Sequence, residues 1–295
     1  GGNRADGIWA ARNAFYKGEP AKAVDKLFAE FVDGQVTYED MANYQSRWMA
    51  PLHTTYRGYD FYTCDGWSQG PRMILFLNVL ENFDLKSLGY NTPEYIHLIS
   101  QVIDLAMADC HKYIGDPDFV DIPKALYSKE YAKERIKLID MEKAFQDMPP
   151  WGDPRNMKNI SPDSPKTFAR IPYSDTAMAE HLQRDQLDTN SLNIMDAQGN
   201  LFSMTESDGH MSTPMIPGWG FGLGSRGNQF NLDSELANVV APNKRPRNTN
   251  TPFVVMKDGK PFLGLSLSGG DQQAQQLLQI FLNILIFEIS LYFQV

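Results

Sequence analysis

The stretch Asp188-Thr189-Asn190-Ser191-Leu192-Asn193-Ile194-Met195-Asp196 lies near the middle of the chain, after a long Pro-rich connector. A turn at Ala197-Gln198-Gly199-Asn200 follows it, and the chain returns as Leu201-Phe202-Ser203-Met204-Thr205. Two β-type runs on either side of a glycine-containing turn predict a hairpin. If the bond between Asp188 and Thr189 were cut, Thr189 would carry a hydroxyl and a free α-amine, which together make a nucleophile with its own base.

The composition is that of a globular protein. The 295 residues are 42% hydrophobic and 12% aromatic, which is enough for one large core or two modest ones. The 27 basic and 36 acidic residues give a net charge of −9, so nucleic acid is not an expected partner. Cys64 and Cys110 are too few and too far apart for a disulfide framework or a metal site, and the histidines are scattered. We expect no metal and no cofactor.

The apolar run Leu277–Tyr292 is the candidate for a membrane span. It is shorter than the roughly 20 residues that a span needs, and Gln279, Asn283 and Glu288 interrupt it. It therefore predicts a buried core helix, and no membrane span is expected. The chain begins without a methionine and stops soon after this helix, so both ends are expected to be breaks in a longer protein.

Helical spacing of apolar residues dominates the first half of the chain. Thr37-Tyr38-Glu39-Asp40 resembles a helix start with Thr37 as the cap, and Thr92-Pro93 starts a longer helix. One strand is expected over Arg57–Thr63. The predicted helices are Ala10–Tyr16, Pro20–Phe31, Met73–Phe83, Thr92–Tyr113 and Ser128–Phe145.

The composition changes to Pro, Asn, Asp and Ser between Pro149 and Pro172, which predicts a flexible surface connector. After this connector the pattern becomes β. The predicted hairpins are Thr189–Met195 with Leu201–Thr205, and Phe253–Met256 with Pro261–Leu267 around the tight turn Lys257-Asp258-Gly259-Lys260. A helix over Gln272–Phe287 follows. Helices first and strands with a terminal helix afterwards indicate the α+β class.

A Ser-Gly-Gly turn, Ser268-Gly269-Gly270, stands between the last predicted strand and the last predicted helix. Backbone N–H groups at such a turn can hold a phosphate or stabilise an oxyanion in acyl transfer. The following Asp271 disfavours a second anion, which argues against phosphate. The alternative is a tight strand-to-helix turn without a ligand.

Three hydroxyls, those of Ser203, Thr205 and Ser207, recur with a period of two on the return strand and so share one face. Ser207 could orient Thr189 from there. The alternative is an exposed Ser/Thr face with no role in chemistry. A serine-hydrolase site is not expected, because the Gly-x-Ser-x-Gly motif of a nucleophile elbow is absent.

Many short segments resemble, in order, the γ-glutamyltransferase (γ-glutamyl transpeptidase) family of N-terminal-nucleophile (Ntn) hydrolases. In the first half they are Phe15–Gly18, Thr37–Tyr44, Pro51-Leu52, Tyr56–Tyr59, Leu77–Asp84 and Ala108–Pro117. In the second half they are Asp188-Thr189, Asp196–Asn200, Pro217–Gly220, Ala241–Pro246 and Gly269-Gly270. The resemblance implies an αββα sandwich, incomplete in this chain, because the family's N-terminal region and the end of its small subunit are missing.

The resemblance also implies self-cleavage between Asp188 and Thr189. Residues 1–188 would be the C-terminal part of a large subunit, mostly helical and ending in a flexible linker over 149–188. Residues 189–295 would be the N-terminal part of a small subunit from the same precursor. Thr189 would be the nucleophile, its amine the base, and the N–H groups of Gly269 and Gly270 the oxyanion hole, while Ser207 stands where the family has a second, supporting threonine. A γ-glutamyl or related amide would be the small-molecule substrate, as in glutathione breakdown.

The residues implied to bind the substrate depart from the family pattern. Asn248-Thr249 stands where the family has a pair of serines for the substrate carboxylate. Asn228-Gln229-Phe230 stands where an acidic segment grips the substrate amine, so Gln229 takes the place of a carboxylate. Asn190-Ser191 replaces the usual Thr-His, and Cys110 replaces an arginine. Two alternatives follow: an amidohydrolase or acylase for a substrate without an α-amine, and a non-catalytic homologue that acts as a scaffold or binding module.

Overall fold

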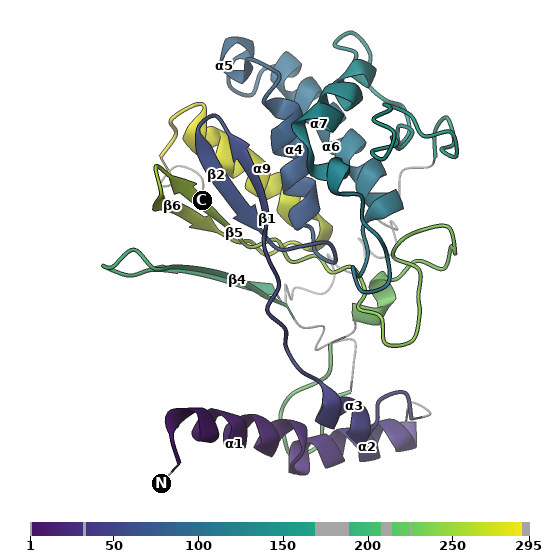
Figure 1. Ribbon diagram of the computed structural model, residues 1–295, viewed down its shortest axis with the longest axis vertical. Coiled ribbons are helices and arrows are strands. Elements are labelled where there is room, and N and C mark those ends of the chain that lie inside the picture. The colour runs from purple at the N-terminus through teal and green to yellow at the C-terminus, as the bar shows by residue number, and fades with distance from the viewer. Residues whose placement is uncertain (1, 32–33, 169–188, 208–213, 225, 291–295) are drawn as a thin grey trace. The chain divides into compact units, whose positions relative to one another are not determined.

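The computed structural model describes residues 2–31, 34–168, 189–207, 214–224 and 226–290 (Figure 1). The chain forms two compact units, one from residues 1–49 and 208–225 and the other from 50–207 and 226–295. The larger unit contains residues from both sides of the cleavage point predicted before Thr189.

The smaller unit is helical. It contains α1 (Arg4–Tyr16), α2 (Glu19–Phe31) and α3 (Tyr38–Asn43). Thr37 caps α3 as predicted: its hydroxyl accepts from the N–H of Asp40, whose carboxylate in turn accepts from the N–H of Thr37. The small core of this unit consists of Ala21, Val24, Leu27, Phe28, Met41 and Ile216.

The larger unit is built on a four-stranded antiparallel sheet with the order β1-β2-β5-β6. Its strands are β1 (Leu52–Tyr56), β2 (Tyr59–Thr63), β5 (Phe253–Lys257) and β6 (Lys260–Leu265). The single strand expected over Arg57–Thr63 is wrong at its start, because Arg57 and Gly58 have φ angles of 48° and 81° and form the turn between β1 and β2. The predicted hairpin of β5 and β6 is confirmed.

Helices cover one face of this sheet. The larger ones are α4 (Gly70–Leu80), α6 (Pro93–Tyr113) and α9 (Gln273–Leu285). All residues of α4 are buried, so α4 is the central helix of the core. Phe281 of α9 reaches the sheet, where its ring contacts those of Tyr56, Phe61 and Phe253. The predicted core helix near the C-terminal end is therefore confirmed. The shorter elements are α5 (Leu85–Leu88), η1 (Lys124–Tyr127), α7 (Lys129–Arg135), η2 (Ile136–Leu138), η3 (Arg226–Gln229) and η4 (Gly270–Gln272).

A separate hairpin of β3 (Thr189–Met195) and β4 (Leu201–Ser207) packs on the opposite face of the sheet (Figure 1). In β6, Leu263 and Leu265 pack into the helix-covered core, so Gly264 between them faces away from it. A Cβ on Gly264 would lie 2.9 Å from Leu201, which means that the hairpin lies directly against this face. Helices, sheet and hairpin are thus three successive layers, consistent with the expected α+β sandwich.

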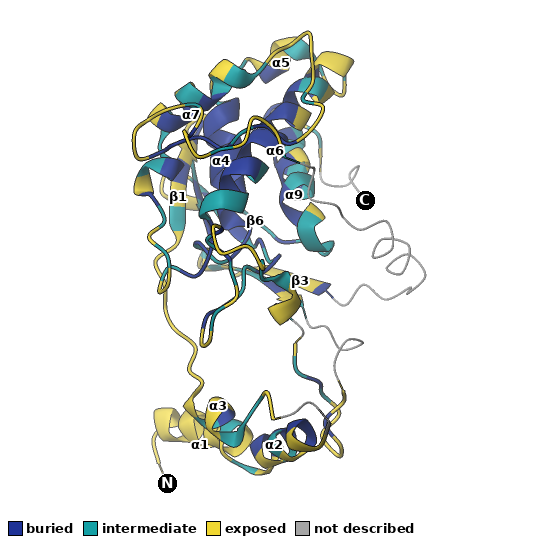
Figure 2. Ribbon diagram, turned by 90° about the vertical axis from the view of Figure 1, so that its right-hand side faces the viewer, coloured by how far each residue is buried: buried dark blue, intermediate teal, exposed yellow. Residues whose placement is uncertain are grey.

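The two faces of the β3–β4 hairpin differ in polarity. Asn193 and Ser203 on the inner face bond to Ser266 and to the carbonyl of Leu265, at 3.0 Å in each case. Leu192, Ile194 and Phe202 on the outer face are 43%, 52% and 52% exposed. Figure 2 shows β3 as mostly exposed apart from Thr189. The middle of this hairpin therefore makes polar contacts on its inner face and exposes apolar side chains on its outer face.

Two predictions between residues 128 and 172 are wrong. The helix expected over Ser128–Phe145 ends at Arg135 and continues only as a short 3-10 turn to Leu138. The connector expected on the surface from Pro149 is wrong only in its first part: residues 149 and 151–154 are buried, whereas residues 155–168 are exposed or half-buried apart from Ser161. Buried Asp109 accepts from the N–H of Gly152 at 2.9 Å, and buried Arg135 donates to the carbonyl of Pro150 at 2.9 Å. These bonds hold the segment against the core, while residues 169–172 lie outside the described part of the chain.

None of the helices that the structure describes is long and apolar enough to cross a membrane. Within the same residues, no three His, Cys, Asp or Glu side chains gather in a way that could hold a metal ion.

Candidate active site

Thr189 and Ser207 are directly paired at the open end of the β3–β4 hairpin. Their hydroxyl oxygens lie 2.8 Å apart, which is hydrogen-bond distance. Thr189 is buried and Ser207 is partly exposed. Asp188, the residue before the expected cleavage point, lies outside the described residues.

Arg226 at the start of η3 donates a hydrogen bond from its guanidinium to the hydroxyl oxygen of Ser207. A guanidinium carries only donors, so Ser207 is the acceptor in this bond. The hydroxyl hydrogen of Ser207 is then available for Thr189. We infer that Ser207 is the donor and the Thr189 oxygen the acceptor in the bond between them.

The Ser268-Gly269-Gly270 turn lies next to Thr189. The hydroxyl of Ser268 donates to the carbonyl of Thr189. Gly269 and Gly270 have φ angles of 128° and 54°, a region that favours glycine, and η4 begins at Gly270 and leads directly into α9. The carbonyl of Gly269 accepts from the N–H of Gln272 at 3.0 Å. This bond occupies a carbonyl of the turn. It does not use the N–H groups of Gly269 and Gly270, which an oxyanion hole needs as donors.

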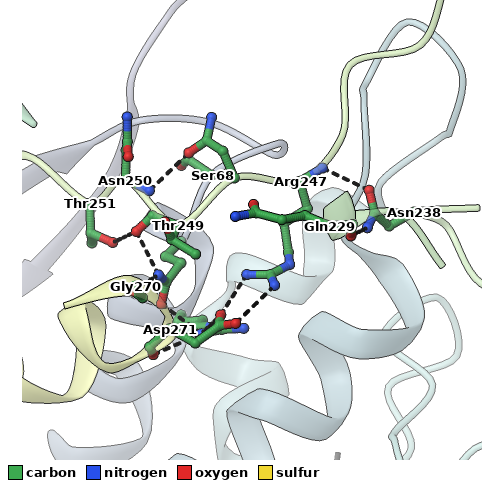
Figure 3. A network of polar contacts seen from close by, with 12 residues as sticks. Ser68, Gln229, Asn238, Arg247, Thr249, Asn250, Thr251, Gly270 and Asp271 are labelled. Atoms are coloured by element: carbon green, nitrogen blue, oxygen red, sulfur yellow. Dashed lines mark hydrogen bonds and ion pairs between the residues drawn. The ribbon is translucent and has the colours of Figure 1, made fainter. Parts of the chain in front are cut away.

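Gln69, the N-cap residue of α4, joins this turn to the segment that contains Asn248 and Thr249. Its side-chain amide donates to the carbonyls of Thr249 at 2.5 Å and of Gly270 at 2.8 Å. Thr249 and Gly270 thus lie on either side of one amide group (Figure 3). The side chain of Asn248 accepts from the N–H of Asn250 at 2.9 Å, and the side chain of Asn250 donates to the carbonyl of Thr205 on β4 at 3.1 Å.

Two buried polar atoms in this region have no hydrogen-bond partner among the described residues. They are the hydroxyl of Thr205 and the side-chain oxygen of Asn250. An unpaired buried donor or acceptor costs about 1–3 kcal/mol, and the buried Tyr95 and Tyr127 hydroxyls outside this region are unpaired as well. The position of Thr205 on β4 and of Asn250 beside Asn248 places the first two atoms within the predicted site.

Asp271 binds two arginines. Its carboxylate accepts from Arg72 at 3.0 Å and from Arg247 at 2.8 and 3.3 Å (Figure 3). Burial alone would raise the pKa of Asp271, but Arg247 and Arg72 outweigh burial and the pKa lies below its ordinary value. The expectation that Asp271 repels anions from the turn is therefore wrong, because two guanidinium groups more than balance its charge.

Gln229 at the end of η3 bridges Arg226 and Arg247. With its amide oriented to satisfy both neighbours, its nitrogen donates to the Arg247 carbonyl at 2.6 Å and its oxygen accepts from Arg226 at 3.1 Å. Asn238 donates to the Gln229 carbonyl at 2.6 Å and accepts from the N–H of Arg247 at 2.7 Å. The side chain of Gln229 therefore holds protein groups in place.

All described members of the predicted site belong to the larger unit and are joined by these short contacts. They are Thr189, Ser207, Gln229, Asn248, Thr249, Gly269 and Gly270. Arg226, Arg247 and Gln69 also belong to this network and were not predicted. Their charge and amide groups gave no signal in the sequence, because their partners lie far away along the chain.

The family profile of gamma-glutamyltranspeptidase matches residues 7–294, and the chain belongs to this family. The "Glutathione hydrolase proenzyme" of Escherichia coli (strain K12) is 30% identical over 280 residues, which cover 94% of this chain and 45% of the relative. The "Acylase ACY 1 proenzyme" of Pseudomonas sp. (strain SE83) is 27% identical over 283 residues, covering 95% and 45%.

Among solved structures, the cephalosporin acylase from Bacillus halodurans is similar to this chain with a TM-score of 0.76 and 26% sequence identity. The match covers 94% of this chain and 45% of the acylase. The α+β fold expected from the sequence is thus the fold of this family. The chain spans a little under half the length of the relatives it matches.

Proposed function

We propose that the protein to which this chain belongs is a self-processing Ntn hydrolase that hydrolyses or transfers the acyl group of a γ-glutamyl or related amide. The observation that carries the proposal is the direct contact of Thr189 with both Ser207 and Ser268. These contacts unite a candidate nucleophile, a supporting hydroxyl and a Gly-Gly turn in one place. Family membership supports the same reaction class.

The first step would be cleavage of the Asp188–Thr189 peptide bond, which leaves Thr189 with a free α-amine. In each turnover this amine takes the proton of the Thr189 hydroxyl while the hydroxyl oxygen attacks the carbonyl carbon of the substrate amide. The N–H groups of Gly269 and Gly270 would stabilise the negative charge on the carbonyl oxygen. The hydrogen bond from Ser207 would stabilise the Thr189 oxygen as its proton leaves.

Collapse of this intermediate breaks the carbon–nitrogen bond, and the leaving amine receives the proton from the Thr189 amine. The acyl group stays on Thr189 as an ester. Water, or the amine of an acceptor, then attacks the ester and restores the threonine hydroxyl. Every group in this sequence is a hydroxyl, an amine or a backbone N–H, and no step draws on a metal or cofactor.

The decisive experiment is to express the full-length protein and follow its processing by gel electrophoresis and N-terminal sequencing. We expect two fragments, the smaller beginning Thr-Asn-Ser-Leu, together with hydrolysis of γ-glutamyl or other acyl p-nitroanilides. A Thr189→Ala variant should stay intact and inactive. A wild-type protein that remains one band and releases no p-nitroaniline would instead support the scaffold alternative.

A further inference from the structure

Gln69 is a fully buried residue at the start of α4, with an exposed fraction of 0%. Its side-chain nitrogen donates to the carbonyls of Thr249 at 2.5 Å and of Gly270 at 2.8 Å. Its side-chain oxygen accepts from Arg72 at 2.6 Å. The amide thus spends both of its N–H groups on backbone carbonyls that lie far away along the chain.

The orientation of this amide follows from Arg72. A guanidinium carries only donors, so Arg72 must face the amide oxygen of Gln69, which turns both N–H groups toward Thr249 and Gly270. Arg72 also donates to the carboxylate of Asp271 at 3.0 Å, and Asp271 directly follows Gly270. The side chain of Arg72 is only 7% exposed, so the group that orients Gln69 is itself packed in place.

The Gly269-Gly270 turn depends on outside bonds for its shape. Two glycines in succession give the chain unusual conformational freedom, because neither has a Cβ. Their carbonyls accept from the N–H groups of Gln272 and Gln273, which are local contacts of one short helical turn. The bond from Gln69 comes from a residue 201 positions earlier and ties Gly270 to α4, whose residues are all buried. This bond therefore fixes the turn relative to the core.

A second side chain holds the other end of the turn. Ser268 donates from its hydroxyl to the carbonyl of Thr189, which ties the turn to β3. Together the two bonds set where the N–H groups of Gly269 and Gly270 lie relative to the Thr189 hydroxyl. Oxyanion donors act at about 2.7–3.1 Å from the oxygen that they stabilise. A displacement of about 1 Å can cost about 100-fold in rate, so the bond from Gln69 has a kinetic consequence.

We propose that Gln69 is a positioning residue for the reaction at Thr189, because its amide holds the Gly269-Gly270 turn in the alignment that stabilises the oxyanion. The proposal rests on the proposed function, since it requires these N–H groups to act as the oxyanion hole. Gln69 bonds to the carbonyl of Gly270 and so leaves the donors of the turn to a substrate. It is fully buried and acts through the turn, so its loss should lower kcat and leave KM nearly unchanged.

The test is Gln69→Met in the full-length protein, which removes the amide and keeps a similar side-chain volume. We expect kcat to fall by about 10- to 100-fold on the acyl p-nitroanilide that the wild type hydrolyses fastest, with KM nearly unchanged. Gln101→Met is the matched control, because Gln101 is 1% exposed in α6 and its side-chain nitrogen donates to the carbonyl of Asp140 at 2.7 Å. It should lower the unfolding temperature to a similar extent and leave kcat unchanged.

Hydrogen exchange followed by mass spectrometry gives a second readout that does not depend on activity. In Thr189→Ala protein, the amides of Gln272 and Gln273 report opening of the turn, because they bond to the two glycine carbonyls. Adding Gln69→Met should speed their exchange by about 3- to 10-fold, the worth of one hydrogen bond. Adding Gln101→Met should leave it unchanged.

Three results would overturn the proposal: equal losses of kcat in Gln69→Met and Gln101→Met, a loss in Gln69→Met that appears only in KM, or unchanged exchange at the turn. A wild type that neither cleaves itself nor turns over a p-nitroanilide contradicts the proposed function. The exchange measurement alone then decides whether Gln69 fixes the turn.

Discussion

The hydroxyl oxygens of Thr189 and Ser207 lie 2.8 Å apart across the open end of the β3–β4 hairpin. Ser207 also accepts a hydrogen bond from Arg226, which leaves the hydroxyl hydrogen of Ser207 available for donation to Thr189. The local order of the groups is therefore guanidinium, serine and threonine. Each of the first two can be removed separately, which makes their roles measurable.

We expect Ser207→Ala to lower kcat of the full-length protein by about 100-fold, because the Thr189 oxygen loses the donor that stabilises it as its proton leaves. Ser207→Thr should keep most of the activity, since it retains the hydroxyl. Ser203→Ala is a matched control on the same face of β4, where the serine bonds to Asn193 and the Leu265 carbonyl. Equal losses for Ser203→Ala and Ser207→Ala would contradict the role given to Ser207.

Arg226→Met should reduce kcat by about tenfold and change KM little, because its guanidinium acts on Thr189 through Ser207 and its loss removes one charge-assisted hydrogen bond. A double-mutant cycle checks this route. If Arg226 works through Ser207, adding Arg226→Met to Ser207→Ala should cost almost nothing further. Independent losses that multiply would show that Arg226 acts elsewhere.

The ion pair of Asp109 and Arg135 should matter for stability. Both side chains are 1% exposed, and Nε of Arg135 lies 3.0 Å from Oδ2 of Asp109. Replacing Asp109 by alanine leaves the charge of Arg135 buried without its counter-ion, which should lower the free energy of unfolding by about 3–5 kcal/mol. Urea unfolding followed by circular dichroism measures this loss.

The exposed pair of Arg155 and Asp121 serves as the control for that measurement, with side chains 49% and 90% exposed. Asp121→Ala should change the free energy of unfolding by no more than about 1 kcal/mol. Similar effects at Asp109 and Asp121 would mean that the buried pair adds nothing to the fold.

Asp271 should give the larger unit a measurable pH dependence. Its pKa in the folded chain lies below its ordinary value of 3.8, despite burial, because Arg247 and Arg72 favour the charged form. A lowered folded pKa contributes stability above the unfolded value, and this contribution is lost as the pH falls below about 4. Between pH 6 and pH 3 the wild type should therefore lose more stability than Asp271→Asn. Thermal melts of both proteins across this pH range measure the difference. Equal losses of stability in the wild type and in Asp271→Asn would show that the ion pairs contribute nothing.

Local signals were sufficient for much of the fold. Asp258-Gly259 fixed the second hairpin, and the caps at Thr37 and Thr92 marked where α3 and α6 begin. Those predictions succeeded because turn and cap chemistry acts over a few residues. Thr189, Ser207 and the Gly-Gly turn were predicted from a family pattern and a period of two along β4, and the structure brings them together, while their roles stay predictions.

Features that depend on partners far away along the chain could not be predicted from the sequence. The segment after Met148 has the composition of an exposed connector, yet Asp109 and Arg135 hold it against the core through its backbone. Arg247 follows a proline in a polar stretch, and only the fold brings it to Asp271 and Arg72. Composition predicts solvent exposure on average, and it cannot predict a bond to a residue many positions away.

The unequal faces of the β3–β4 hairpin have a consequence for strand alignment. Side chains alternate along a strand, so a shift of β3 by a single residue would turn every side chain to the other face. Leu192 and Ile194 would then point at the layer where Asn193 and Ser266 now bond, and the hydroxyl of Thr189 would turn outward. The hydrogen bonds of Asn193 and Ser203 on the inner face resist that shift, because it would break them. These bonds therefore favour the strand alignment in which the hydroxyls of Thr189 and Ser207 lie within hydrogen-bond distance.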